Sequence, residues 1–177
     1  MLRYVLTSLF ICTSIFFTAA CSSYQVKIDA DPDSEFERYE TFGWLTTSKK
    51  IDAFSRIDNN RLTALVHNAA DRIMTAKGYE KLIQGDPDLV LTFYAGVKGA
   101  IEVDDEGYTY GRWFDGGMMV EQEGVLIIDL IDNERRVLVL RARGGTIVDD
   151  PETAGELIEK MIQNMFADFP ERSYQDD

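Results

Sequence analysis

The chain has few of the residues that carry most enzyme chemistry. Its 177 residues include one histidine, His67, and two cysteines, Cys12 and Cys21. A single histidine without a cysteine partner excludes a Cys–His dyad and a histidine-rich zinc site. The sequence also lacks a G-x-S-x-G motif and a glycine-rich loop of the phosphate-binding kind. Because no nucleophile, base or ligand set converges, the sequence predicts no enzyme, no cofactor and no metal site.

Positive charge is also scarce. The chain has 18 Lys and Arg residues against 31 Asp and Glu residues, which gives a net charge of −13. A strongly acidic domain repels phosphate backbones and anionic lipid headgroups, so nucleic acid is not an expected partner. Attachment to a membrane must then come from something other than a basic face.

Long apolar runs are confined to the N-terminus, where Val5–Phe17 is short for a membrane-spanning helix. Arg3 precedes this run, and Thr18-Ala19-Ala20 leads to Cys21, as in the signal peptide of a bacterial lipoprotein. An uncleaved anchor or an ordinary cleaved signal leaves the cysteine at this position unexplained. We therefore expect acylation of Cys21, which makes the lipid bilayer a partner. In a Gram-negative source, Ser22 rather than Asp favours the outer membrane, with the domain facing the periplasm.

Cleavage before Cys21 also defines the domain organisation. The signal peptide is 1–20, the lipidated cysteine and a short tether are 21–23, a single domain is 24–170, and a polar tail is 171–177. Loss of residues 1–20 removes Cys12 and Arg3, which leaves 157 residues, one cysteine and a net charge of −14. The folded domain therefore has no disulfide and is long enough to be held by its own core.

Hydrophobic periodicity predicts two amphipathic helices. The first covers 59–77, with apolar residues at 62, 65, 66, 69, 73 and 76, and Gly78 follows its end. The second has Asp150 as its N-cap and Pro151 at its first position, and Pro170 ends it. Its apolar stripe runs from Leu157 to Phe169 and needs a sheet or helix to cover it.

Alternating or continuous apolar runs predict strands at 24–28, 41–45, 79–83, 88–97, 124–132 and 136–144, and the last two form a hairpin. Arg141 and Arg143 alternate with Leu140 and Ala142, which predicts that one face of the last strand becomes solvated. The element order predicts the α+β class, with a mostly antiparallel sheet and two amphipathic helices packed on one face.

The segment 98–123 combines aromatic residues with glycine and methionine. We interpret six of its residues as a contact surface: Tyr108, Tyr110, Trp113, Phe114, Met118 and Met119. The alternative is that these aromatics cover the sheet face away from the helices.

An acidic stretch near the start of the domain has the spacing of an EF-hand. Its residues are Asp29, Asp31, Asp33, Glu35, Glu37 and Glu40. Ser34 stands where the sharp turn needs glycine, Pro32 interrupts the loop, and a strand rather than a helix precedes it. We interpret the stretch as a solvated acidic turn. Four aromatic residues in and after it, Phe36, Tyr39, Phe42 and Trp44, are expected in the core.

The same stretch carries a family resemblance. Phe36, Tyr39, Thr41, Phe42 and Trp44 match, in order, the motif D-x-x-x-D-F-x-x-Y-x-T-F/Y-x-W. This motif opens DUF4136, a family of bacterial lipoproteins with a domain of unknown function. Further matches are Ala76–Tyr79, Asp86–Leu91 and Gly124–Asp132, whereas Leu140 takes the place of a usual tryptophan. The resemblance extends over nearly all of 24–170 and implies a lipoprotein without implying an activity.

These features predict a lipid-anchored outer-membrane protein whose periplasmic domain is not an enzyme. Its expected role is structural or in envelope interaction, with an unidentified envelope protein as partner. The second hypothesis is a periplasmic ligand-binding module that uses a cleft beside 98–123. A concave pocket lined by Tyr110, Trp113 and Phe114 would favour the second hypothesis, whereas an exposed apolar patch or a long unpaired edge strand would favour the first.

Overall fold

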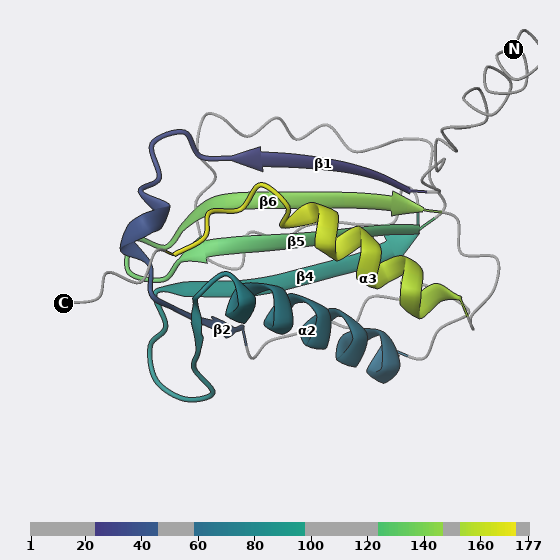
Figure 1. The fold of residues 1–177 in the computed structure, drawn as a ribbon, viewed down its shortest axis with the longest axis horizontal. Helices are drawn as coiled ribbons and strands as arrows, with labels where there is room; N and C mark the ends of the chain where they lie inside the picture. Colours follow the sequence, from purple (N-terminus) through teal and green to yellow (C-terminus); the bar gives the residue numbers. More distant parts are fainter. Residues whose placement is uncertain (1–23, 46–58, 98–123, 147–152, 173–177) are drawn as a thin grey trace, which may run out of the picture.

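The structure, a computed structural model, describes residues 24–45, 59–97, 124–146 and 153–172. These residues form one six-stranded sheet with two helices on the same face (Figure 1). Neither of these helices is long and apolar enough to cross a bilayer.

The elements follow the predicted order. The strands are β1 (Tyr24–Ala30), β2 (Thr41–Trp44), β3 (Glu80–Lys81), β4 (Leu89–Val97), β5 (Gly124–Asp132) and β6 (Val137–Thr146). The helices are α2 (Asn59–Ala76) and α3 (Ala154–Met165), and a short 3-10 helix, η1 (Phe36–Arg38), lies between β1 and β2. The predicted hairpin is confirmed as β5 and β6, which pair antiparallel.

The sheet is mixed, which corrects the prediction of a mostly antiparallel sheet. Its strand order is β1-β6-β5-β4-β2-β3. The longer pairings, from β1 to β4, are antiparallel, whereas β2 is parallel to both β4 and β3. The reason is the position of α2 in the chain. A strand that returns through a helix before the next strand produces a parallel pair, which a hairpin cannot.

Helix α2 begins at the predicted residue and ends at Ala76, one residue before the predicted end. Its C-terminal end is closed by Gly78, which has a φ of 91° and whose N–H donates to the carbonyl of Thr75. A positive φ of this kind is favourable for glycine and strained for other residues. The buried stripe differs slightly from the prediction, because Ala70 and Met74 are buried while Ala76 is exposed.

Helix α3 is shorter than predicted. It begins at Ala154 and ends at Met165, and the chain continues as turns to Phe169. The predicted cap Asp150 and Pro151 lie outside the described residues. The turns are bonded to the residue that follows α2, because Lys77 Nζ donates to the carbonyl of Phe169 at 2.6 Å. Phe166 and Phe169 therefore stay buried without helical backbone.

The main core lies between the helices and one face of the sheet. Leu89 and Leu91 of β4, and Leu126, Ile128 and Leu130 of β5, share it with the buried faces of both helices. Gly144 lets α3 approach β6 closely, since an added Cβ would lie 2.6 Å from Met161 Cγ. Leu140, which stands where the family usually has tryptophan, is part of this core.

Candidate functional site

The site residues predicted from the sequence lie outside the described residues. These are Cys21, Tyr108, Tyr110, Trp113, Phe114, Met118 and Met119. The cleft predicted beside 98–123 lies there too. The described residues contain several polar clusters and a groove, and these are the candidates for a functional site.

The sheet face opposite the helices carries a group of charged side chains, which we call the ionic row: Lys27, Asp29, Asp129, Arg141 and Arg143. Arg141 lies opposite both Asp29 and Asp129 in the neighbouring strands. Its Nε donates to Asp129 Oδ1 at 2.6 Å, and its Nη2 bonds the second carboxylate oxygen. Arg143 bonds Asp29, and Lys27 Nζ lies 3.5 Å from the same carboxylate.

Both arginines of the ionic row are buried, so the predicted solvated face of β6 is wrong. Arg141 is 3% exposed, Arg143 is 2% exposed and Asp129 is fully buried. Arg141 and Arg143 do alternate with Leu140 and Ala142 between the two faces of the sheet, but each guanidinium meets a carboxylate from a neighbouring strand instead of water. A two-point Arg–carboxylate contact is a strong and geometrically fixed interaction. The row therefore holds three strands together and leaves little charge to act on a ligand.

Tyr39 of the opening motif is hydrogen-bonded to the last residue of β5, Asp132. Its hydroxyl donates to Asp132 Oδ2 at 2.9 Å. Burial of the phenol, followed by this hydrogen bond and the charge of Asp132, raises the pKa of Tyr39 to about 12. The phenol therefore stays protonated at neutral pH and acts as a hydrogen-bond donor.

Thr41 joins the starts of β2 and β4. Its hydroxyl donates to Asp88 Oδ2 at 2.8 Å and accepts from the backbone N–H of Asp88 at 2.9 Å. The N–H groups of Glu40 and Thr41 bond the same carboxylate. Burial would raise the pKa of Asp88, but these hydrogen bonds and the charge of Arg172 outweigh it and lower the pKa. Asp88 is thus held ionised as a structural acceptor.

Trp44 connects β2 to α2. Its indole ring stacks on His67 with a centroid distance of 3.9 Å, and Phe93 packs edge-on against both rings. Its Nε1 donates to Asp71 Oδ1 at 2.8 Å, and Lys81 Nζ bonds the other oxygen at 2.6 Å. Burial lowers the pKa of His67, and Lys81 lowers it further while Asp71 opposes this. The histidine is therefore a neutral stacking partner at neutral pH.

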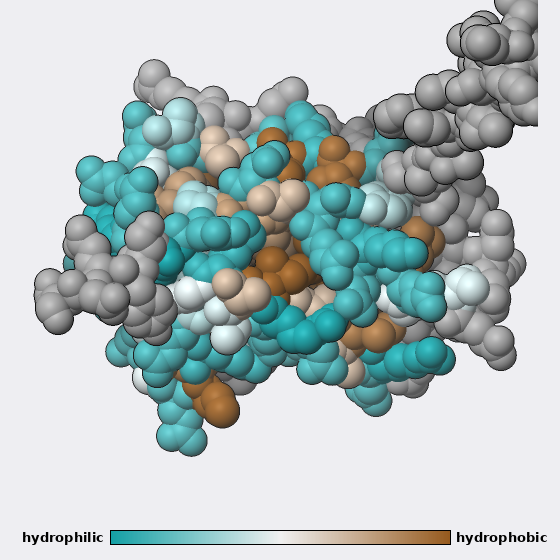
Figure 2. Space-filling model, in the orientation of Figure 1, coloured by the Kyte–Doolittle hydropathy of each residue, from teal (hydrophilic) through white to brown (hydrophobic). Residues whose placement is uncertain are grey.

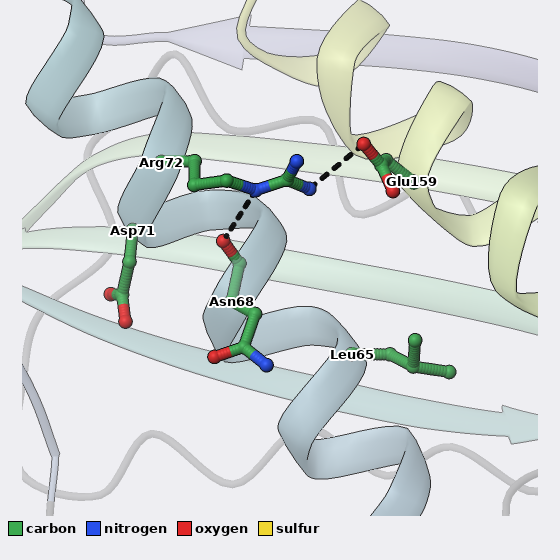
Figure 3. Close-up of a pocket in the computed structure, with 5 residues that line it drawn as sticks. All are labelled: Leu65, Asn68, Asp71, Arg72 and Glu159. Atoms are coloured by element: carbon green, nitrogen blue, oxygen red, sulfur yellow. Dashed lines mark hydrogen bonds and ion pairs between the residues drawn. The ribbon is translucent and has the colours of Figure 1, made fainter.

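An open groove lies between α2 and α3, with a volume of about 520 Å³. Figure 3 shows its lining residues, which are Leu65, Asn68, Asp71, Arg72 and Glu159. Arg72 and Glu159 point toward one another, and their Nη2 and Oε1 atoms are 2.8 Å apart. Arg72 Nε also donates to the carbonyl of Asn68. The polar walls of the groove are therefore largely bonded to each other.

The sequence did not identify this groove. Leu65, Asn68 and Arg72 are three, four and seven positions apart, which places them on one face of α2. Leu65 belongs to the apolar stripe predicted for the core, and in the structure it is half-buried and lines the groove. The partner Glu159 depends on how α3 packs, which no local pattern reveals.

The acidic residues with EF-hand spacing do not share one site. Asp31 accepts from the backbone N–H of Asp33 at 3.0 Å, which makes a turn. Asp29 belongs to the ionic row, and Glu40 pairs with Arg172 at 2.9 Å. Across 24–45, 59–97, 124–146 and 153–172, no three His, Cys, Asp or Glu residues are placed to hold a metal ion.

The chain was compared with known proteins. No curated protein matches it. A crystal structure of a DUF4136 family protein from Bacteroides thetaiotaomicron is similar, with a TM-score of 0.61 and 13% identity, over 82% of this chain and 95% of that one. A PDZ domain protein from Parabacteroides distasonis has a TM-score of 0.51 and 17% identity, over 97% of this chain and 40% of that one. At these identities the likeness shows the fold alone.

The family itself is established by the sequence profile of DUF4136, a domain of unknown function, which matches residues 26–171. This range includes the opening motif and every described strand and helix except the first two residues of β1. The chain therefore belongs to the DUF4136 family.

Proposed function

We propose that this protein is a lipoprotein anchored in the outer membrane through acylated Cys21, with a non-enzymatic domain in the periplasm. The role of that domain is interaction or structure in the cell envelope. The observation that carries the proposal is the apolar run Val5–Phe17 followed by Thr18-Ala19-Ala20-Cys21. Membership in DUF4136 supports it, because the family resemblance implies a lipoprotein.

The start of the fold fits a short anchor. Strand β1 begins at Tyr24, three residues after Cys21. Three residues reach at most about 11 Å when fully extended. Two or three acyl chains exceed what stable anchoring requires. The folded domain would thus be kept against the membrane surface rather than on a long flexible tether.

The polar clusters support a non-enzymatic role. The carboxylate of Asp71 is bonded by both Trp44 and Lys81, and Arg141 is bonded to Asp129. A catalytic site needs a nucleophile or base directed toward a substrate. In the described part of the chain these groups are instead directed toward one another. Strand β1 supports an interaction role, because it is a seven-residue strand at the edge of the described sheet.

The anchoring is tested by comparing Cys21→Ala with Cys12→Ala. We expect Cys21→Ala to lose incorporation of labelled palmitate, and either to leave the membrane fraction or to remain unprocessed. Cys12→Ala is the matched control, since it removes the other cysteine from the signal peptide and should be acylated normally. Normal labelling of Cys21→Ala would refute the lipoprotein. Ser22→Asp tests the location, because it should move the protein to the inner membrane.

Ligand binding is the second candidate function, and the groove between α2 and α3 is the observation that favours it. A ligand there would have to compete with the Arg72–Glu159 pair for its hydrogen bonds. Because of this competition, the groove supports ligand binding less strongly than the N-terminal segment supports the lipoprotein.

A further inference from the structure

Strand β1 is the long edge of the described sheet. It pairs on one side, with β6, and Figure 1 shows it as the outermost coloured strand. The opposite edge is β3, which has two residues, whereas β1 has seven. A long edge strand presents backbone donors and acceptors that another strand can bond.

We propose that this edge binds a second copy of the chain, through antiparallel pairing of β1 with β1 of the partner. Residues opposed across an antiparallel pair point to the same face, so the two-fold axis must pass at a residue of the strand. The centre of the pairing is therefore a single residue, and the charges of β1 decide which one.

The charge pattern selects Ile28 as the centre. With the axis at Ile28, Lys27 of each copy lies opposite Asp29 of the other, so two pairs of opposite charge form. An axis at Lys27 opposes two lysines, and an axis at Asp29 opposes two aspartates. Opposite charges directly across a sheet stabilise it and like charges destabilise it. Strand β1 is therefore self-complementary in one register.

Exposure along the strand agrees with this register. The side chain of Lys27 is 42% exposed and its Nζ lies 3.5 Å from its own Asp29, so a second Asp29 would extend the ionic row. On the helix face, Val26 and Ile28 are only partly buried, and Figure 2 shows apolar surface where β1 lies. In this register Ile28 would meet Ile28 of the partner, and Val26 would meet Ala30.

The pairing is closed, because both copies use the same edge and no further copy can add there. The inference rests on the interaction role proposed above and names its partner. It does not depend on acylation, so its failure and the failure of the anchoring at Cys21 are distinguished by separate measurements.

The first experiment measures the mass of the full-length mature protein, purified in detergent, by light scattering or sedimentation over a range of concentrations. We expect a dimer for the wild type. Lys27→Glu places a carboxylate opposite Asp29 twice and should weaken the dimer by about tenfold or more. Arg136→Glu makes the same change of charge on the β5–β6 turn and should leave the dimer intact. A monomeric wild type, or a dimer that Lys27→Glu does not weaken, would overturn the proposal.

The second experiment tests the register with single introduced cysteines. The chain without an added cysteine is oxidised in parallel as the control, so any disulfide formed by Cys21 itself is measured separately. At Ile28 the two copies face each other, whereas at Gln25 they are six residues apart along the strands, or about 20 Å. Oxidation should give a disulfide-linked dimer for Ile28→Cys and not for Gln25→Cys. Equal crosslinking at both positions would overturn the register. If Ile28→Cys fails to fold, the mass measurement on Lys27→Glu still tests the register, because only an axis at Ile28 places residue 27 opposite Asp29 of the partner.

Discussion

The pair of Arg141 and Asp129 offers a direct measurement of what the buried charges contribute to stability. Asp129→Asn keeps the shape of the side chain but removes the charge that the guanidinium faces. Asp129 is fully buried and Arg141 is 3% exposed, so water cannot replace the lost carboxylate. The substitution leaves a buried cation without its counter-charge. Removing one partner in this way destabilises a protein more than replacing both partners with apolar residues.

The expected loss of unfolding free energy is about 3–5 kcal/mol, the usual cost of removing one partner of a buried ion pair. Total stabilities of single domains are about 5–15 kcal/mol, so this is a large fraction. For a domain of this size it corresponds to a melting temperature lower by about 6–20 °C. Replacing both residues with leucine should recover much of the loss, because no buried charge is left uncompensated.

The matched control is Glu159→Gln, which breaks the pair with Arg72. That pair has a similar N–O distance of 2.8 Å, but its side chains are 63% and 40% exposed. An exposed pair contributes about 0–1 kcal/mol, so the control should change stability very little. Thermal and urea unfolding of both variants, followed by circular dichroism, gives the comparison. If Asp129→Asn costs no more than Glu159→Gln, the argument from burial is refuted.

Three further predictions use the same unfolding assays. Tyr39→Phe should lose about 1.5–3 kcal/mol, because the Asp132 carboxylate loses a donor. Tyr79→Phe should be neutral or stabilising, since the Tyr79 hydroxyl is buried with no hydrogen-bond partner in the described structure; equal losses would contradict this. Burial lowers the pKa of His67 from 6.5, so the unfolded chain binds its proton more readily, and stability is lost as the pH falls below 6.5. Melting temperatures between about pH 7 and pH 5 should fall less for His67→Phe, which keeps the ring but cannot titrate, and parallel curves would refute the claim.

The sequence predicted the elements well because their signals are local. Helix α2 shows its apolar period and its terminal Gly78 in consecutive residues, and the β5–β6 hairpin shows two apolar runs around a turn. The ionic row was missed because its partners are distant in sequence. Asp29 and Arg143 are 114 residues apart, and only the pairing of β1 with β6 brings them together. From the sequence alone, a charged residue within a strand is predicted to face solvent, because the neighbouring strand that carries its partner is not known.

The end of α3 was also not predictable from local sequence patterns. Apolar spacing through Phe166 and Phe169 continued the helical stripe, and Pro170 gave a stop. Burial of these rings is compatible with a helix or with turns, so periodicity alone does not distinguish them. The carbonyl of Phe169 is instead bonded by Lys77 of the segment after α2. The contact between Lys77 and the Phe169 carbonyl joins residues 92 positions apart, so the local spacing of apolar residues does not reveal it.

The opening motif of the family is best explained by the parallel part of the sheet. A hairpin fixes the register of its strands through the geometry of its turn, but β2 reaches its place beside β4 only after a helical crossover. Side chains must then set the register, and the motif supplies them. Thr41 binds Asp88 at the start of β4, and Trp44 binds Asp71 on α2. Because these motif residues bond to the protein's own strands and helix, a match to the motif predicts the fold.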